Sequence, residues 1–541
     1  MKLETFFEKF DQFADAPDAV EKMRELVLDL AATGRLLPRK GEWETRSLKS
    51  LATKIGSGAT PAGGRESYFS KGIPLIRSMN VHFRGFDRTG LVFLSDEQAD
   101  ELSNVTVQAN DVLLNITGAS IGRVTIAPNE MAGARVNQHV TIIRPTSELF
   151  PRFLSMFLAS PSVQRMIDDI QVGATRQALT KGMIEQFAVP LPPLAEQKRI
   201  VAKVDELMAL CDRLALQQQE RETRHAALAR ASLARFADAP TPANLPFLFH
   251  PSYAIPPADL RKSILTLAVQ GKLVPQDPND EPAGELLAQI RGDHRVQKKG
   301  SKADPSQIAE DELPHEVPFG WCWSCVQELA QANESVTYGI LKPVWVEVGV
   351  PTVRVTEMKT GLIDVGALPK CDPQRAAKFS KTTLNESDLL VSKDGTIGKT
   401  AFVPRELAGG NITQHMLRFA ISKRLDRDFV RLCIDAPPCQ AWMVGETKGV
   451  ALQGVNVGDF RRMPLPVPPL AEQRRIVAKV EQLMSLVDAL ETQLAASRAT
   501  AANLLSALVA GLTSASANAN GAPHASPGQR PGKPSAKPIK G

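Results

Sequence analysis

A 13-residue stretch that begins at Pro192 occurs a second time in this chain, beginning at Pro468. The first copy reads PPLAEQKRIVAKV and the second PPLAEQRRIVAKV, and 18 of the 25 positions in 190–214 are identical in 466–490. Pro-Pro favours an extended backbone and strong helix formers follow it, so each copy predicts the start of a helix. A repeat of this kind means that the chain consists of two related halves.

A second repeated element precedes each copy. Residues 24–38 (RELVLDLAATGRLLP) match residues 261–275 (RKSILTLAVQGKLVP). Both stretches carry apolar residues at helical spacing and then a glycine, Gly34 or Gly271, which predicts a short amphipathic helix that ends in the left-handed conformation. Residues 18–21 (DAVE) have the pattern of a capping box at the start of the first of these helices. We expect a scaffold role in each half.

Two segments with a different pattern lie between the helices. Short β-branched apolar runs alternate with Gly- and Asn-rich breaks, and a helical stretch at about 150–170 follows in the first segment. The runs of the first segment are 73–76, 111–116, 123–127 and 139–143. Sparse anchors align the second segment with the first, and most residues between the anchors differ. Each segment therefore predicts a mixed α/β domain.

The two repeated motifs open long helices, the first predicted to reach about Arg235 and the second about Leu512. The apolar seam of the second alternates steps of four and three: Ile476, Val480, Leu483, Val487, Leu490, Leu494, Ser497, Ala501, Leu504 and Leu508. A seam of this length needs burial against another helix, and the first long helix is its natural partner.

The predicted fold class is α+β: two globular α/β domains separated by two long antiparallel coiled-coil helices, internally duplicated with pseudo-twofold symmetry. The predicted parts are a helical segment at 1–40, a first globular domain at 41–190, a central long helix at 191–240, a linker and second short helix at 241–290, a connector at 291–315, a second globular domain at 316–466, a distal long helix at 467–512 and a basic tail at 513–541. The connector and the tail have the composition of flexible or disordered chain.

Composition excludes some classes of protein. No run of about 18 apolar residues and no secretory signal pattern occur, so we expect a cytoplasmic protein without a membrane span. The net charge of +5 falls to +1 without the four basic residues of the tail, so any basic surface must be local. The CxxC at 322–325 has no second pair, which favours buried structural thiols over a zinc or redox site.

The chain carries no complete catalytic or cofactor motif. Residues 395–400 (GTIGKT) resemble a phosphate-binding loop, but two residues separate the glycines where that loop needs four. The matching stretch 118–122 lacks Lys-Thr, so we expect a strand-connecting turn in both domains.

The alternation of a globular segment and a PPLAEQ-type helix resembles the specificity (S) subunit of type I restriction–modification systems, the HsdS family. The resemblance extends from the first short helix to about Leu512 and rests on the duplicated motif, the G-(R/K)-L-(L/V)-P helix ends and the G-W-x-W segment at Gly320. It implies two target-recognition domains that each read one part of a split, asymmetric site in double-stranded DNA, with the long helices as a ruler between them.

The resemblance also implies partners and cofactors. Two methylase subunits would dock on the duplicated helices and separate restriction subunits would cut the DNA. No cofactor is expected in this chain, since S-adenosylmethionine would be bound by the methylase subunit and ATP and Mg by the restriction subunit. The residues expected to bind the methylase are the apolar positions Leu194, Ile200, Val204, Leu207, Leu470, Ile476, Val480 and Leu483.

Candidate DNA contacts are loop side chains that can bond base edges or phosphates. In the first domain they are Arg77, Ser78, Asn80, Thr117, Arg123, Arg135, Asn137, Arg176 and Lys181. In the second they are Arg354, Lys359, Lys393, Lys399, Gln414, Lys448 and Gln453. The pairs Gln138-His139 and Gln414-His415 recur in both halves, which favours a role in holding the fold over discriminating bases.

Two other classes of function stay open. A standalone nuclease or methyltransferase would turn over its substrate as a purified chain, and the missing motifs count against it. A coiled-coil adaptor without direct DNA reading would give no sequence-dependent footprint on DNA even with its partners present.

Overall fold

The computed structural model contains two compact units, 1–221 with 496–541 and 222–495. Each unit holds one globular domain, one short helix, the first part of one long helix and the last part of the other. The described residues are 14, 16, 18–38, 41–60, 68–172, 178–250, 252–297, 313–359, 361–445 and 454–514. The predicted tail at 513–541 lies almost entirely outside them.

The first domain has a helical layer, two larger sheets and two sheets of two strands each. Its strands are β1 (Glu44–Ser47), β2 (Ala52–Ser57), β3 (Ile73–Ile76), β4 (Val81–His82), β5 (Gly85–Phe86), β6 (Val92–Leu94), β7 (Val112–Asn115), β8 (Val124–Ile126), β9 (Arg135–Val136), β10 (Val140–Pro145) and β11 (Ala188–Leu191). Its helices are α4 (Leu48–Leu51), α5 (Asp96–Glu101), α6 (Pro151–Ala159), α7 (Pro161–Val172) and α8 (Lys181–Glu185). The central sheet has the antiparallel order β2-β10-β7-β8, and the second sheet, β6-β3-β9, joins β3 to β9 in parallel. The two-stranded sheets are β1-β11 and β4-β5.

The second domain repeats this layout. Its strands are β12 (Cys322–Cys325), β13 (Thr337–Tyr338), β14 (Trp345–Val346), β15 (Val350–Val353), β16 (Met358–Lys359), β17 (Leu362–Ile363), β18 (Lys370–Cys371), β19 (Leu389–Ser392), β20 (Thr400–Phe402), β21 (Asn411–Ile412), β22 (Met416–Phe419) and β23 (Pro464–Val467). Its helices are α13 (Pro373–Ala377), α14 (Arg427–Asp435), α15 (Pro437–Gly445) and α16 (Val457–Arg462). The orders β13-β22-β19-β20 and β14-β18-β15-β21 match the first domain, with β14 added at one edge.

Alternation along the buried central strand assigns its two faces. In β7, Val112 and Leu114 face the helical core, whereas Leu113 faces the second sheet. In β19, Leu389 likewise faces the helical core and Leu390 faces the second sheet. The predicted apolar runs of the first domain are therefore confirmed as β3, β7, β8 and β10. The predicted helical stretch is two helices, because a proline at position 161 cannot continue α6.

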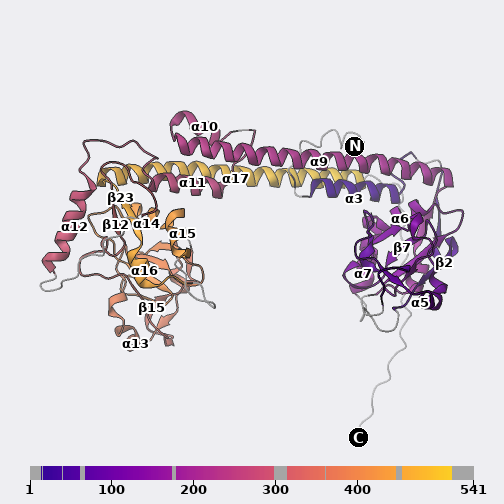
Figure 1. Cartoon of the computed structure of the whole chain (residues 1–541), viewed down its shortest axis with the longest axis horizontal. Coiled ribbons are helices and arrows are strands. Elements are labelled where there is room, and N and C mark those ends of the chain that lie inside the picture. The colour runs from indigo at the N-terminus through magenta and orange to yellow at the C-terminus, as the bar shows by residue number, and fades with distance from the viewer. Residues whose placement is uncertain are drawn as a thin grey trace, which may run out of the picture. The chain divides into compact units, whose positions relative to one another are not determined.

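A buried glutamine joins each domain to its long helix, and we call this contact the glutamine junction. The long helices are α9 (Leu194–Asp238) and α17 (Leu470–Ser514), shown in Figure 1. Gln197 is fully buried; its Oε1 accepts from Phe150 N (2.7 Å) and its Nε2 donates to Glu148 O and Pro192 O (both 2.8 Å).

The second half repeats this arrangement. Gln473 is also fully buried, accepts from Asp426 N (2.9 Å) and donates to Pro468 O (2.9 Å). Because the amide partners lie at the start of α6 or α14 and before the long helix, the glutamine fixes the two helices against each other. This explains why the motif is duplicated almost unchanged.

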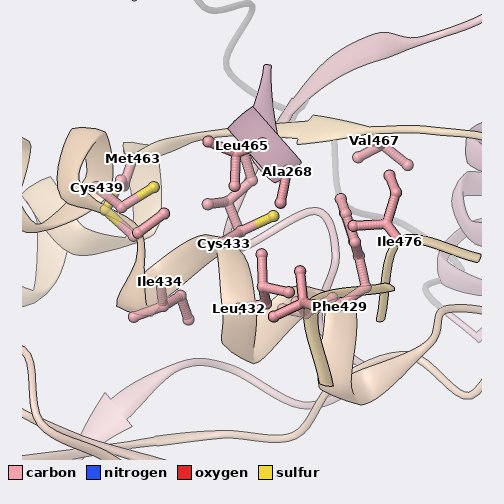
Figure 2. Packing of buried hydrophobic residues seen from close by; sticks show 14 of the residues in the cluster. Ala268, Phe429, Leu432, Cys433, Ile434, Cys439, Met463, Leu465, Val467 and Ile476 are labelled. Atoms are coloured by element: carbon pink, nitrogen blue, oxygen red, sulfur yellow. The ribbon is translucent and has the colours of Figure 1, made fainter. Parts of the chain in front are cut away.

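Aromatic packing surrounds the junction in both halves. The ring of Trp43 meets Phe153 edge to face at 6.5 Å, and that of Trp321 meets Phe429 at 6.4 Å. Trp321 Nε1 also donates to Glu472 Oε2 (3.0 Å), the glutamate of the second motif. Figure 2 shows Phe429 on α14 beside Ile476 at the start of α17, within the helical core of the second domain.

The short helices α3 (Ala19–Ala32) and α11 (Pro257–Val269) pack against the long helices (Figure 1). In the first unit Arg24 pairs with Asp212 of α9 at 2.5 Å, and in the second Arg261 pairs with Asp488 of α17 at 2.6 Å. These residues occupy equivalent positions of the two repeats. The glycines after both helices have positive φ, as predicted, and the duplicated helix is a scaffold element.

The long helices bury their apolar positions only near their ends. The last part of α17 shares a core with α3 and the first part of α9, and the last part of α9 shares a core with α11 and the first part of α17. This order is that of an antiparallel pair. The predicted seam of α17 is not unbroken: at its centre Leu490 and Leu494 are only partly buried and Ser497 is exposed. The corresponding stretch of α9, 212–228, also has no buried residue.

Two further predictions need correction. Asp18 does not cap α3: its φ of 57° is left-handed, whereas a capping residue has an extended backbone, and its side chain makes no capping bond. The predicted connector at 291–315 begins within a helix, because α12 (Ala283–Gln297) extends into it and buries Leu286, Leu287 and Ile290 in the core. The predicted linker at 241–290 also contains the short helix α10 (Leu245–Leu248), and 298–312 lie outside the described residues.

The glutamine junction predicts a large stability effect. Gln473→Ala leaves Asp426 N and Pro468 O buried without a partner, so we expect the free energy of unfolding to fall by about 3 kcal/mol. Gln493→Ala, at an exposed position of the same helix, is the matched control and should change it by less than about 0.5 kcal/mol. Denaturant titration followed by circular dichroism measures both, and equal effects would contradict the junction.

Candidate nucleic-acid interface

Three chain segments meet at one end of the central sheet in the first domain: the end of β3, the end of β7 and the loop before β10. Asn115 at the end of β7 donates to Ser78 O (2.8 Å), just after β3. Asn137 N donates to Ile76 O (3.1 Å), and Ile116 N donates to His139 O (2.9 Å). The candidates after β3, after β7 and before β10 therefore lie on one face.

The second domain builds the same face. Thr413 N donates to Val353 O (3.0 Å) and Lys393 N donates to His415 O (3.0 Å). These bonds bring the candidates Arg354, Lys393 and Gln414 to equivalent places. The two faces share a frame and differ in most of their side chains.

The turn after β7 and after β19 is held from beneath by a glutamine. Gln164 donates to Gly122 O (3.0 Å), and Gln440 donates to Gly398 O (3.0 Å). A Cβ at either glycine would lie within 2.4 Å of the glutamine side chain, so the glutamine packs closely against the turn. The antiparallel pairing of β19 with β20 confirms that 395–400 is a strand-connecting turn.

An arginine lies over an aromatic ring at the end of β3 and of β15. Arg77 is 5.8 Å from the ring centroid of Tyr68, and Arg354 is 5.8 Å from that of Trp345. Arg77 also donates to Gly90 O (2.6 Å), whereas Arg354 pairs with Glu357 (2.6 Å). The hydrogen bond to the Glu357 carboxylate raises the pKa of Arg354. Both guanidinium groups are thus held in place, the second with its charge partly neutralised.

Three candidates of the first domain are buried. The amide of Asn80 accepts from Arg77 N and donates to the carbonyls of Asp87 and Thr89. Arg135 donates to backbone carbonyls, among them that of Ala99 at 2.8 Å, and Asn137 accepts from His139 N. Because these groups are used inside the domain, we assign Asn80, Arg135 and Asn137 to the fold.

The other described candidates remain at the surface or partly exposed: Arg77, Ser78, Thr117, Arg123, Lys181, Arg354, Lys359, Lys393, Lys399 and Gln414. Arg123 and Lys399 occupy equivalent positions immediately before β8 and β20. Arg176, Lys448 and Gln453 lie outside the described residues. Sequence reasoning did not select Tyr68 and Trp345, although the recurrence of an aromatic residue nine positions before an arginine was a signal for them.

The expected methylase-binding residues need correction. Ile200, Val204 and Leu207 are buried in the first helical core, and Ile476, Val480 and Leu483 in the second. These side chains face the chain's own domains and short helices because each long helix must cover its domain core. Of the expected residues, Leu194 is exposed and Leu470 is partly exposed.

The cysteines and other potential ligands give no metal site among the residues that the structure describes. Cys322 and Cys325 lie on β12, three positions apart and therefore on opposite faces of the strand. Burial raises the pKa of both thiols, in keeping with structural cysteines. Within the described helices, none combines the length and apolar character needed to cross a bilayer.

Comparison with known proteins gives consistent matches. The Type I restriction modification DNA specificity domain matches residues 40–222 and 328–497. The EcoAI specificity subunit of Escherichia coli is 31% identical over 90% of this chain and 93% of that protein. The EcoEI specificity subunit of Escherichia coli is 27% identical over 68% of this chain, and the match spans 66% of that relative's length. The HsdS subunit from Thermoanaerobacter tengcongensis, a solved structure, is 18% identical over 88% of this chain and 97% of that one, with a TM-score of 0.43.

The assignment of Asn80 to the fold predicts a contrast between two candidates. Asn80→Ala removes three internal hydrogen bonds, so we expect the free energy of unfolding to fall by about 2–4 kcal/mol. Arg123→Ala, at a partly exposed side chain, should change it by less than about 0.5 kcal/mol. Thermal and denaturant unfolding measure both effects. An Asn80→Ala protein as stable as the unaltered protein would contradict the assignment of Asn80 to the fold.

Proposed function

The chain belongs to the family of type I restriction–modification DNA specificity subunits, and we propose that it reads a bipartite, asymmetric DNA site with its two globular domains. The observation that carries this proposal is the shared frame with unlike faces. Both domains present their candidates at the same end of the central sheet, but the side chains there differ. Two similar frames with different side chains suit two different base sequences.

Direct contacts with DNA would come from the exposed side chains of these faces. Arginine bonds guanine in bidentate fashion, glutamine bonds adenine, and lysine or serine bonds the phosphate backbone. Arg77 and Arg354 are the strongest candidates for base contacts, because the aromatic ring and the backbone or carboxylate partner hold each guanidinium in place. Arg123 and Lys399 would contribute charge at equivalent positions.

The partner surface lies on the exposed side of the duplicated helices. Near the junctions, exposed positions are identical or alike in the two copies: Ala195, Lys198 and Ala202 on α9, and Ala471, Arg474 and Ala478 on α17. Small side chains let another helix approach closely, and equal surfaces suit two copies of one methylase subunit. Restriction subunits would join through that assembly.

In this proposal the chain itself is not an enzyme. The sequence lacks a complete catalytic or cofactor motif, and the one stretch that resembled a phosphate-binding loop is a strand-connecting turn. S-adenosylmethionine would bind the methylase subunit, and ATP and Mg the restriction subunit. Methyl transfer or DNA cleavage by the purified chain without partners would refute this part.

The modular reading of DNA is tested by domain exchange. Residues 43–190 are replaced by the corresponding domain of a specificity subunit with a different site, and the methylated sequence is determined in cells. We expect one half of the site to change and the other half and the spacer to stay the same, because each domain has its own cores and its own face. A change in both halves, or in neither, would contradict independent reading.

A further inference from the structure

The pair Gln138-His139 recurs as Gln414-His415 with the same geometry. The distance from Gln Nε2 to His Nε2 is 3.2 Å in both domains. The first pair lies in the loop before β10 and the second in the loop before β22, on the face that carries the DNA candidates. His415 has 48% of its side chain exposed. A surface pair of this kind contributes little to a core, so its recurrence needs another reason.

In the second domain, hydrogen bonding fixes the orientation of the glutamine amide through the histidine. His415 Nδ1 is 2.8 Å from Asp394 Oδ2, which also accepts a hydrogen bond from Lys393 Nζ at 2.8 Å. A carboxylate only accepts, so Nδ1 carries the hydrogen, and Nε2 of the neutral imidazole is an acceptor. With the imidazole neutral, Gln414 directs its NH₂ group, and not its carbonyl oxygen, toward His415, which is the orientation in the structure.

In the first domain the same amide orientation is reached by another route. Asp394 is replaced by Thr117, whose hydroxyl contacts His139 Nδ1 and can donate or accept, so it does not fix the tautomer. Instead, the hydroxyl of Thr60 donates to Gln138 Oε1, which leaves Nε2 to face His139. Two different sets of neighbours thus orient the glutamine in one way.

The oriented amide retains a donor. An amide NH₂ has two N–H groups, and His139 or His415 takes one; the other has no partner within the part of the chain that the structure describes. A cation accompanies it in both domains: Arg123 and Lys399 lie at the same end of the sheet, one strand beyond β7 or β19.

We propose that Gln138 and Gln414 each donate this N–H to a phosphate of the DNA backbone, one in each half-site. Identical residues with the same Gln–His contact, within faces that otherwise differ, suit the part of the ligand that does not depend on sequence. The backbone phosphates are that part, whereas a base contact would require the same base in both half-sites. The inference rests on the proposed function and assigns these pairs to positioning the DNA, not to holding the fold.

The test uses the chain assembled with its methylase subunit and a duplex that carries its site. Single phosphates are replaced one at a time by uncharged methylphosphonates, and the dissociation constant is measured. For the unaltered complex we expect about a tenfold loss at one phosphate in each half-site, the value of a hydrogen bond to a charged group. The Gln414→Glu complex should bind the unmodified duplex at least about tenfold more weakly and lose its sensitivity at one of the two phosphates only.

Gln138→Glu should remove the sensitivity in the other half-site. Gln331→Glu is the matched control, because it makes the same charge change at an exposed position beyond the opposite end of β22. It should leave affinity and phosphate sensitivity unchanged. The phosphate scan of the unaltered complex needs no protein variant, so it tests the inference even if a variant folds poorly.

Other outcomes overturn the inference. If a glutamine variant changes the base preferred at one position of the site, the glutamine contacts a base and not a phosphate. If a variant lowers the thermal stability but leaves the sensitivity to every phosphate unchanged, the pair stabilises the fold, as the sequence suggested. If the unaltered complex binds the duplex no better than an unrelated one, the proposed function fails as well, whereas specific binding without the two sensitive phosphates removes only this inference.

Discussion

The architecture depends on a side-chain amide that is sealed from water. Gln197 and Gln473 each bond backbone groups at the start of α6 or α14 and before α9 or α17. A buried amide that replaces water with backbone partners tolerates few substitutions, because every other side chain leaves a donor or an acceptor unpaired. Within each unit, the direction in which the long helix leaves its domain is therefore fixed by the same contact.

The rigid frame continues through the sheet to the candidate interface. At the start of β7 the buried Asp111 pairs with Arg144 at 2.8 Å, and at the start of β19 Asp388 pairs with Arg418 at 2.5 Å. Burial raises the pKa of Asp388, which the hydrogen bond from Arg418 opposes. These pairs fix one end of the central strands, and the variable faces lie at the other end. A constant scaffold therefore supports side chains that differ between the domains.

The sequence predicted the parts of the fold that follow from periodicity and repetition. The helices after both PPLAEQ motifs and the strands β7 and β10 were found where apolar patterns placed them. Periodicity says that a residue is buried but not against what, so Val204 was taken for a partner contact although it faces its own domain. Residue type says that a side chain can bond DNA but not that it is available, which is why Asn80 was selected although backbone carbonyls occupy its amide.

We propose that the junctions transmit the length of the long helices to the spacing of the two half-sites. No side chain of 212–228 or 488–500 is fully buried, and one heptad added to each keeps the apolar positions in register while it lengthens each helix by about 10 Å. Since 10–10.5 base pairs of DNA span about 34–36 Å, this corresponds to roughly three base pairs. Methylome sequencing of cells with the lengthened chain should show both half-sites unchanged and a spacer longer by about three base pairs. Full methylation at the original spacer would contradict the account.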